Sequence, residues 1–506
     1  MPTIAFDNTY ARELPGFYAP WHPALAPAPR LLYLNQALAT ELGLELAAVA
    51  GAEAAALWAG NAVPDGAEPL AQAYAGHQFG RFSPQLGDGR ALLLGEVIDT
   101  LGKRRDIAFK GSGRTPFSRG GDGKATVGPM LREVLIGEAM HALGVPSTRA
   151  LAVVATGETV PRDRPLPGAV LTRVAASHLR VGTFQYFAAK GQLDKLRQLV
   201  DYAIARHDPD LSGMPGRSTA LLRTVAGRQA RLIAQWMHLG FIHGVMNTDN
   251  MTISGETIDY GPCAFLEVYN PATVFSSIDL SGRYAYGNQP AIARWNLARL
   301  AETLLPLIAL ESGATSDNEA ALQAAVAQVS AVIDEFPGLY SRAFHRGLMA
   351  KLGLVQAQDD EADAALGADW LTLLEQQGAD FTLAWRHLAD AAVGDANPLR
   401  AQLAKPTAAD AWLVRWQARC AQEDVGRSAA GVDRAAGMRA VSPWLIPRNH
   451  RVEEALAAAS DNNNLAPFEH LLAALKRPFI EDAAWARYAQ PASAQLTAAY
   501  QTFCGT

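Results

Sequence analysis

Two oxygen-bearing side chains, Asn250 and Asp259, lie nine positions apart in the stretch HGVMNTDNMTISGETIDYG, residues 243–261. A carboxylate and an amide oxygen suit Mg²⁺, which prefers a few protein oxygens completed by phosphate oxygens. Asp249 directly precedes Asn250 and is the only carboxylate between residues 243 and 250. The stretch therefore predicts metal-assisted chemistry on a ligand that carries phosphate.

The same stretch aligns without a gap with the kinase pattern H-R-D-L-x-x-x-N, whose Asp is the catalytic base. His243 and Asn250 occupy the matching positions, and the triplet DYG, 259–261, stands where kinases carry D-F-G. Val245 stands at the base position and cannot accept a proton. Transfer of phosphate to a hydroxyl placed as in kinases should therefore fail. Either the chain only binds nucleotide, or the nucleotide is bound in another way than in kinases and a different phosphorus atom is attacked. A kinase that uses Asp249 as a shifted base is a third reading.

Glycine is dense between residues 72 and 128, in YAGHQFG, LGDGR, FKGSGR and RGGDGKATVG. Glycine permits tight turns and lets backbone N–H groups approach a phosphate closely. Gly87 and Gly89 of LGDGR precede a predicted strand. A lone Gly-Asp-Gly is more often a hairpin turn than a phosphate loop, so its value as evidence depends on the neighbouring segments.

Those neighbours are a basic strand and an acidic helix. RRDIAFK ends in Lys110 and resembles the V-A-I-K strand of kinases, whose Lys contacts nucleotide phosphates. The following helix carries Glu133, and a buried lysine needs such a carboxylate partner. Glu138 is a weaker candidate for that role. Each residue alone fits a solvated surface better, but the ordered set of glycine turn, strand Lys and helix Glu favours a nucleotide site.

The elements that must position these residues change in type along the chain. ALLLGEVID, RRDIAFK, TRALAVVATG and GAVLTRVA are typical of strands, and GPMLREVLIGEAMHALGV has helical spacing with Gly144 as a stop. MTISGETIDYG predicts a hairpin that brings Asn250 and Asp259 across from each other. From Leu196 onward helical patterns dominate. A strand-rich front and a helical remainder predict an α+β chain of two lobes with a cleft between them.

Composition limits the class of protein. The 506 residues are 49% hydrophobic and 19% charged, so we expect a packed core. A net charge of −6 argues against a nucleic-acid partner. We see no signal peptide and no run of about 18 uncharged apolar residues, so we expect no membrane partner. The three cysteines are too few for a disulfide scaffold and fit a reducing compartment, so we expect a cytoplasmic protein.

The chain is identified as a member of the selenoprotein O family (SelO), the kinase-like protein adenylyltransferases. The similarity is carried by YAGHQFGRFSPQLGDGRALLLGE, FKGSGRTPFSRGGDGKATVGPMLRE, EAMHALGVPSTRAL, HGVMNTDNM and DYGPCAFLE. It covers most of residues 70–290 and continues in PRNHRVEEAL and NNNLAPFEHLLAAL. It implies a two-lobed protein-kinase-like (pseudokinase) fold. The expected parts are an extension over 1–70, a strand-rich N-lobe over 71–180, a helical C-lobe over 181–400 and a helical extension over 401–506.

The resemblance also implies transfer of AMP in place of phosphate. ATP would lie inverted in the cleft, so that its α-phosphate faces a Ser, Thr or Tyr hydroxyl of a protein substrate and pyrophosphate leaves. Asp249 takes the proton-accepting role, and Asn250 and Asp259 hold Mg²⁺, or Mn²⁺ in its place. The nucleotide contacts that the resemblance implies are Gly87, Gly89, Arg90, Lys110, Asp122, Gly123, Arg173 and Arg180.

Two arginines suit that inverted ligand physically. Phosphates in a new place need new cations, and arginine supplies planar, bidentate phosphate contacts. Arg173 and Arg180 lie seven positions apart in predicted strand or loop. We expect His77 and His178 to form hydrogen bonds within the fold rather than to contact substrate.

Two cysteines carry a further hypothesis. Cys263 lies just after DYG, and Cys504 stands where some family members carry selenocysteine. A thiol on a flexible terminal segment can reach a mobile loop, so a regulatory Cys263–Cys504 disulfide is one reading. A buried Cys263 and an unused Cys504 thiol is the other, and the two are evenly balanced. Cys420 is expected to pack in a helix.

Overall fold

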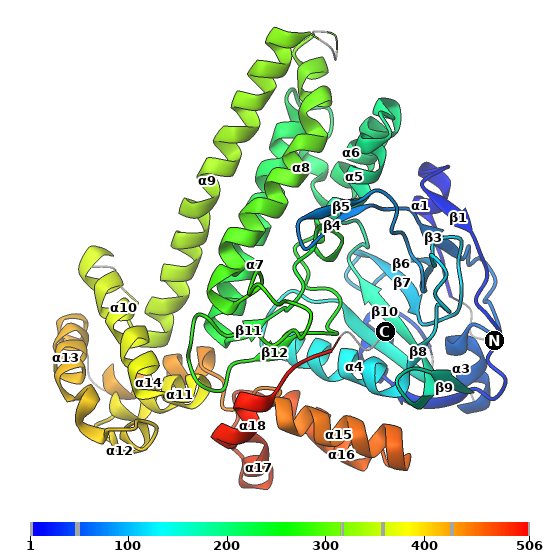
Figure 1. Cartoon of the computed structure of the whole chain (residues 1–506). Coiled ribbons are helices and arrows are strands. Elements are labelled where there is room, and N and C mark those ends of the chain that lie inside the picture. The colour runs from blue at the N-terminus through cyan, green and yellow to red at the C-terminus, as the bar shows by residue number, and fades with distance from the viewer. Residues whose placement is uncertain are drawn as a thin grey trace.

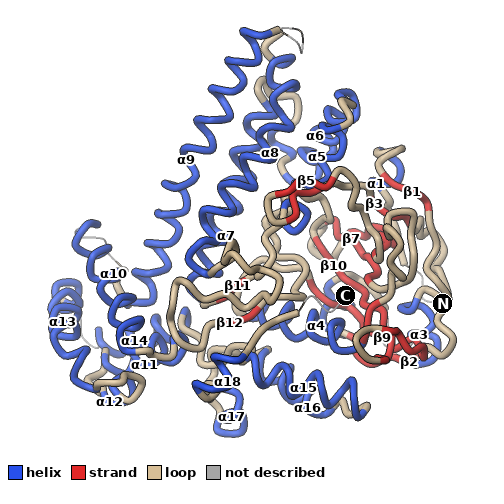
Figure 2. Tube along the Cα trace, in the orientation of Figure 1, coloured by secondary structure: helices blue, strands red, loops and turns tan. Residues whose placement is uncertain are grey.

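The structure is a computed structural model that describes residues 4–45, 51–313, 315, 318–355, 360–425 and 430–503. Strands gather in its first part and helices make up most of the rest, as Figure 1 and Figure 2 show. This order confirms the sequence prediction of an α+β chain, with an antiparallel sheet and many helices. The kinase-like lobes and the four-part division of the chain stay predictions.

One antiparallel sheet dominates the first part. Its strands lie in the order β1-β3-β6-β7-β10-β9-β2, and β8 pairs with β10 beside this path. β1 and β2, which come early in the chain, pair with β3 and β9 and so complete the sheet. The strands of this sheet are β1 (Tyr18–Pro20), β2 (Arg30–Leu34), β3 (Leu70–Gln72), β6 (Ala91–Ile98), β7 (Arg104–Lys110), β8 (Ala125–Thr126), β9 (Arg149–Pro161) and β10 (Pro165–Ala175). Two short pairs lie apart from it, β4 (Gly76–Gln78) with β5 (Arg81–Ser83) and β11 (Phe241–Ile242) with β12 (Ala264–Phe265).

Helices flank the sheet and then build the second part of the chain. α7, α8 and α9 pack along one another and project away from the sheet (Figure 1). Within the described ranges, no helix combines the length and the apolar character that a membrane span needs. The helices are α1 (Thr9–Glu13), α2 (Gln36–Glu41), α3 (Gly51–Ala59), α4 (Val127–Ala142), α5 (Val181–Ala189), α6 (Leu193–His207), α7 (Arg217–Leu239), α8 (Gln289–Glu311), α9 (Glu319–Leu352), α10 (Asp360–Gln377), α11 (Phe381–Ala391), α12 (Asn397–Arg400), α13 (Asp410–Asp424), α14 (Ala430–Val441), α15 (Asn449–Asn462), α16 (Ala466–Leu475), α17 (Ala486–Ala489) and α18 (Ala494–Ala499).

Alternation along β7 decides which side chains reach the site. Ile107 and Phe109 pack on one face of the sheet together with residues of α3. Ala108 packs on the other face, where α4 lies against β9 and β10. Because strand side chains alternate with a period of two, Lys110 points to the same side as Ala108 and α4. The predicted strands 91–99 and 104–110 and the predicted helix after residue 127 are thereby confirmed.

The chain returns to the sheet after α14. α15 and α16 pack against α4, so α4 lies between the sheet and this last helical pair (Figure 1). After α18, the final described residues run back toward the sheet (Figure 1). Segments that are far apart in the sequence therefore enclose one region in front of β10 and α4.

The hairpin predicted over residues 251–261, all of which the structure describes, does not form. Thr252 pairs with Arg180, and Thr257 pairs with Ser147, in two isolated bridges. Each arm of the expected hairpin thus joins a segment distant in the sequence. A two-stranded hairpin alone is only marginally stable, so tertiary partners decide the pairing here.

Candidate active site

A cleft of about 1000 Å³ lies between the sheet and the loops that follow α7. Nine Lys and Arg residues line it against seven Asp and Glu in the part of the chain that the structure describes, and the whole chain has a net charge of −6. This local excess of positive charge suits a ligand rich in phosphate. The cleft brings together all the nucleotide, base and metal positions that the sequence had singled out: Gly87, Gly89, Arg90, Lys110, Asp122, Gly123, Glu133, Arg173, Arg180, Asp249, Asn250 and Asp259.

Lys110, the last residue of β7, forms two ion pairs. Its Nζ lies 2.6 Å from Oε1 of Glu133 and 2.6 Å from Oδ1 of Asp259. Lys110 and Glu133 are buried, because α4 presents Glu133 on the face that packs against the sheet. Carboxylate partners of this kind offset the cost of burying an ammonium group. The structure therefore joins the strand Lys to both the helix Glu and the DYG Asp.

Asp259 is surrounded by cations. Nη1 of Arg173 lies 2.7 Å from its Oδ1, and Nη1 of Arg180 lies 3.9 Å from its Oδ2. Burial acts to raise the pKa of Asp259, but Lys110, Arg173 and Arg180 together hold that pKa well below its usual range. Its φ of 63° is a left-handed conformation, uncommon in residues other than glycine. Asp259 is thus an ionised carboxylate on an unusual backbone turn.

The second carboxylate, Asp249, has a different environment. Nε2 of Gln78 donates to its Oδ1 at 2.5 Å, and Nη1 of Arg180 donates to its backbone oxygen at 3.0 Å. Burial raises the pKa of Asp249 to about 6, although Arg180 opposes the shift. A carboxylate whose pKa lies closer to neutrality is a better proton acceptor than an ordinary one. Two neighbouring carboxylates with pKa values pushed apart are the pattern of a proton-transfer site.

The β4–β5 hairpin holds the loop that carries Asp249, a role that the sequence did not reveal. Nδ2 of Asn247 donates to Oε1 of Gln78 at 3.0 Å, and the Phe79 N–H donates to Oδ1 of Asn247 at 2.9 Å. The His77 ring bonds Gln185 at 2.8 Å, so the internal hydrogen bond expected for His77 is present. The glycine-rich YAGHQFG was the only local signal, and it gave no indication of this long-range partner.

A buried chain of hydrogen bonds orients Arg173. Its Nε donates to Nε2 of His178 at 3.2 Å, and Nδ1 of His178 lies 2.9 Å from Oδ2 of Asp106. Because arginine only donates, Nε2 must be the acceptor and Nδ1 carries the hydrogen. Burial lowers the pKa of His178, and Arg173 adds to the shift, which keeps the ring neutral. Nη2 of Arg206, from α6, binds the other oxygen of Asp106 at 2.6 Å.

The loop glycines have a structural reason of their own. A Cβ on Gly87 would lie 2.4 Å from the ring of Phe117, and one on Gly123 would lie 2.1 Å from the backbone oxygen of Gly113. Gly87 and Gly123 have φ values of 70° and 68°, which side chains disfavour. A Cβ on Gly89 would lie 2.9 Å from the backbone oxygen of Phe117. Glycine is needed for these loops to pack, whatever ligand they contact.

Arg90 and Asp122, two other expected nucleotide contacts, line the cleft together with the loop glycines. Arg90 precedes β6, and its backbone oxygen accepts from the Gly111 N–H at 2.7 Å. Asp122 binds Nη1 of Arg162 at 2.7 Å, and this hydrogen bond lowers the pKa of Asp122. Lys124 binds Glu158. Arg162 is thus a further cation of the cleft that the sequence had not indicated.

The donor atoms of Asn250 and Asp259 fit a divalent cation. Nδ2 of Asn250 donates to the Val245 oxygen at 3.0 Å, which leaves its amide oxygen available. Among the residues that the structure describes, no cluster of three or more His, Cys, Asp and Glu forms a closed protein site for a metal. Two oxygen donors leave positions for phosphate oxygens and water, as Mg²⁺ requires. Nη2 of Arg180 is buried without a hydrogen-bond partner in the described chain, and an anionic ligand would satisfy it.

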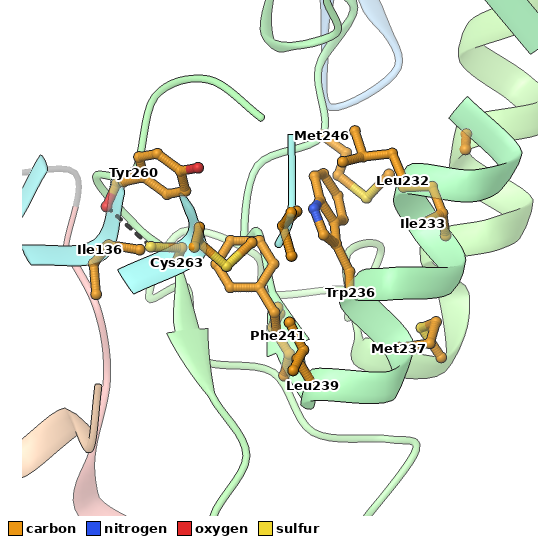
Figure 3. Packing of buried hydrophobic residues seen from close by; sticks show 14 of the residues in the cluster. Ile136, Leu232, Ile233, Trp236, Met237, Leu239, Phe241, Met246, Tyr260 and Cys263 are labelled. Carbon is orange, nitrogen blue, oxygen red and sulfur yellow. Dashed lines mark hydrogen bonds between the residues drawn. The ribbon is translucent and has the colours of Figure 1, made fainter. Parts of the chain in front are cut away.

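Cys263 lies in the hydrophobic core. Its Sγ lies 3.1 Å from the backbone oxygen of Tyr260, and Cys263 belongs to the same buried cluster as Phe241 (Figure 3). Burial raises the pKa of Cys263 to about 12, so the reactive thiolate is scarce. Cys504 lies outside the described residues, and the Cys263–Cys504 disulfide stays a prediction. Cys420 is buried in α13, which confirms its expected packing.

Comparison with known proteins finds similarity over most of the chain. The family model of protein adenylyltransferase SelO matches residues 1–476. A protein nucleotidyltransferase YdiU of Chromobacterium violaceum is 59% identical over 493 residues, which cover 97% of this chain and 100% of that protein. One of Cereibacter sphaeroides is 56% identical over 505 residues, covering 100% of both chains. One of Methylorubrum extorquens is 54% identical and covers 99% of both.

Proposed function

The chain belongs to the family of protein adenylyltransferase SelO, and on this premise we propose that it transfers AMP from ATP to hydroxyl groups of proteins in the cleft of Asp249 and Asp259. The acceptor is the side chain of a Ser, Thr or Tyr. Its oxygen forms a bond to the α-phosphorus of ATP, and the bond between that phosphorus and the bridging oxygen breaks. Pyrophosphate leaves with the bonding electrons, and the hydroxyl proton passes to Asp249.

The observation that carries this proposal is the separation of the two carboxylates by environment. Asp259 binds Lys110 and Arg173 at 2.6 and 2.7 Å, and these cations hold its pKa well below the usual range, so it is a weak base. Asp249 binds only an amide through Oδ1 in the described structure, and its pKa is raised to about 6. Val245, at the position of a kinase base, has no ionisable group. Asp249 is therefore the carboxylate that can accept the acceptor's proton.

The cations support the inverted orientation of ATP. Lys110 projects from β7, and Arg173 and Arg180 lie at the end of β10 and just before α5. All three converge on Asp259, and Arg180 has a buried donor to spare. Arginine pairs suit the β- and γ-phosphates, which in this orientation lie deeper than the α-phosphate. The same arginines would stabilise the charge of the leaving pyrophosphate.

Asn250 and Asp259 are the residues that would hold Mg²⁺, or Mn²⁺, with phosphate oxygens. Such an ion neutralises charge on the phosphates as it develops. Glu133 helps to hold the Lys110 side chain near Asp259, because Nζ of Lys110 lies 2.6 Å from the carboxylate of each. The scarcity of cysteine in the chain suits action on proteins of the cytoplasm.

The mass of modified protein tests the proposal. We expect a mixture of the chain, ATP, Mg²⁺ and an acceptor protein to give an acceptor heavier by one AMP. Label on the α-phosphate should be retained, and label on the γ-phosphate should appear in pyrophosphate. Lys110→Ala and Asp249→Ala should each lower the rate by at least about a hundredfold, as expected for residues that act on the transition state.

Two rival functions predict different products. A kinase with Asp249 as a shifted base would add phosphate alone and retain the γ-label, which would refute AMP transfer. A binding-only pseudokinase would bind ATP, lose metal-dependent binding in Asp259→Ala and never give a modified product. Glu138→Gln is the control for loss of one carboxylate charge outside the cleft, because Glu138 binds Arg149 at 2.6 Å and does not line the cleft.

A further inference from the structure

Residues 499–503, which we call the latch segment, lie in the cleft and pair with the chain just beyond DYG. The Thr502 N–H donates to the Phe275 oxygen at 2.8 Å, and the Ser277 N–H donates to the Thr502 oxygen at 3.0 Å. Thr502 and Ser276 thereby form a parallel β-bridge. Oγ1 of Thr502 also donates to the oxygen of Pro262 at 2.7 Å. One extended residue of the latch segment is thus bound mainly through backbone atoms.

The latch segment is held by few side chains. Thr502 is buried, but Gln501 and Phe503 are exposed, and α18 before it buries no side chain. Tyr500 adds an edge contact to the ring of Phe275 and hydrogen bonds to Arg132 and Glu453. A segment with so little buried apolar surface opens at low cost compared with the core. It is therefore the part of the cleft wall that a competing segment can replace.

The segment beneath it is a short stretch whose residue Ser276 forms the β-bridge to Thr502. Phe275 and Ser276 are 5% and 4% exposed, and Oγ of Ser276 has no hydrogen-bond partner in the described structure. Without Thr502, the oxygen of Phe275 and the N–H of Ser277 would lose these hydrogen bonds and could pair with the backbone of an incoming segment. Ile278 and Leu280 follow at once and are 52% and 96% exposed. This stretch thus combines backbone groups that pair with an extended segment and apolar side chains that are exposed.

We propose that residues 275–278, the acceptor edge, bind the acceptor protein as an extended segment by β-strand addition, in place of the latch segment. This inference rests on the proposed function, because it concerns the protein substrate of the same cleft. Strand addition draws its affinity from the backbone and so accepts many sequences. The fitting partner is an unfolded or flexible stretch that carries a hydroxyl side chain, rather than a rigid folded surface. The hydroxyl of such a stretch enters the cleft that contains Asp249.

A peptide of the latch segment tests the edge directly. The probe is a fluorescent peptide of residues 494–503, AQLTAAYQTF, followed by anisotropy. The test variant of the full chain is Thr502→Pro, which lacks the N–H that donates to the Phe275 oxygen. The matched control, Thr502→Ala, keeps that N–H. We expect the peptide to bind the Thr502→Pro chain at least about tenfold more tightly than the wild-type chain, whose own latch segment competes. The same peptide made with Pro at position 502 should not bind.

A kinetic arm identifies the occupant. Reduced, carboxymethylated lactalbumin serves as a permanently unfolded acceptor. The peptide should raise the KM for this acceptor and leave the KM for ATP unchanged, and the Thr502→Pro chain should have a lower KM for the acceptor. A peptide that raises the KM for ATP, or that binds wild type and Thr502→Pro equally, would overturn the proposal.

The two hypotheses fail separately. If the folded Thr502→Pro chain transfers AMP but does not bind the peptide, the acceptor edge is wrong and the proposed function stands. If the peptide binds as expected while neither chain transfers AMP to any acceptor, the edge stands as a peptide-binding site and the proposed function is wrong. Circular dichroism and thermal unfolding of the Thr502→Pro chain confirm that it is folded before either comparison.

Discussion

Arg173 donates to His178 from one side of its guanidinium group and to Asp259 from the other, at 3.2 and 2.7 Å. Because Asp106 fixes the His178 ring from behind at 2.9 Å, Arg173 points into the cleft in a single orientation. Preorganised cations of this kind bind phosphate without a cost of reordering at the moment of binding. We therefore predict that His178 is a positioning residue that acts on a bound phosphate ligand through Arg173.

Removal of the His178 ring should weaken ATP binding more than it slows the chemical step. We expect His178→Ala to raise the KM for ATP by about five- to tenfold with a smaller fall in kcat, since Arg173 keeps its charge but loses its fixed direction. His207→Ala is the matched control, because His207 is a neighbouring ring that bonds Ser177 at 2.7 Å and does not contact Arg173. Both variants should lose about 1–3 kcal/mol of unfolding free energy for the broken hydrogen bonds. An equal KM in His178→Ala and wild type would show that the ring is only structural.

Gly123 should be essential for folding of the loop independently of any ligand. A methyl group there would lie 2.1 Å from the Gly113 oxygen at a φ of 68°, whereas one on Gly120 would meet nothing within 4 Å at a φ of 88°. Both alanine variants pay the left-handed backbone strain of about 1 kcal/mol, but only Gly123→Ala adds a clash with backbone. We expect Gly123→Ala to be less stable than Gly120→Ala by about 2 kcal/mol or more in urea unfolding. Equal stabilities would mean that the loop adjusts freely.

Glu256 should make stability depend on pH in an unusual direction. Burial raises its pKa to about 7, although the Ala176 N–H and Arg105 oppose the shift. A raised carboxyl pKa means that the folded state binds a proton more readily than the unfolded state, so the unfolding free energy falls as the pH rises from 4.5 to about 7 and stays low above that. Glu256→Gln should therefore raise the unfolding free energy by about 1–3 kcal/mol at pH 8 relative to wild type, and this gain should shrink as the pH falls and disappear below the unfolded pKa of 4.5. A constant difference at both pH values would indicate that the Glu256 carboxyl has an ordinary pKa.

The sequence predicted those parts of the fold and site that local patterns determine. β6, β7 and α4 follow from alternation and helical spacing, and they bring Lys110 to Glu133. The prediction of a hairpin after Asn250 was wrong, because the two segments that were expected to pair with each other pair with residues near 147 and 180. Gln78 could not be found, since its partner Asp249 lies 171 positions away and no local signal records such a contact. Periodicity reports which face is buried but not which distant segment covers it.

Asp259 should control how ATP binding depends on metal. Its carboxylate binds Lys110 and Arg173 and lies 3.9 Å from Arg180, so it competes with phosphates for the same three cations. Asp259→Asn removes that negative charge, and without metal the freed cations should bind ATP several-fold more tightly than in wild type. With Mg²⁺ the variant should gain no further affinity, because the carboxylate that would hold the ion is gone.

Calorimetric titration of ATP in EDTA and in Mg²⁺ checks both of these expectations for Asp259→Asn, with Glu138→Gln as a charge-matched control outside the cleft. AMP transfer by Asp259→Asn should fall at least about a hundredfold. A variant whose ATP affinity still rises with Mg²⁺ as in wild type would contradict a metal role for Asp259 and leave it as a structural partner of the three cations.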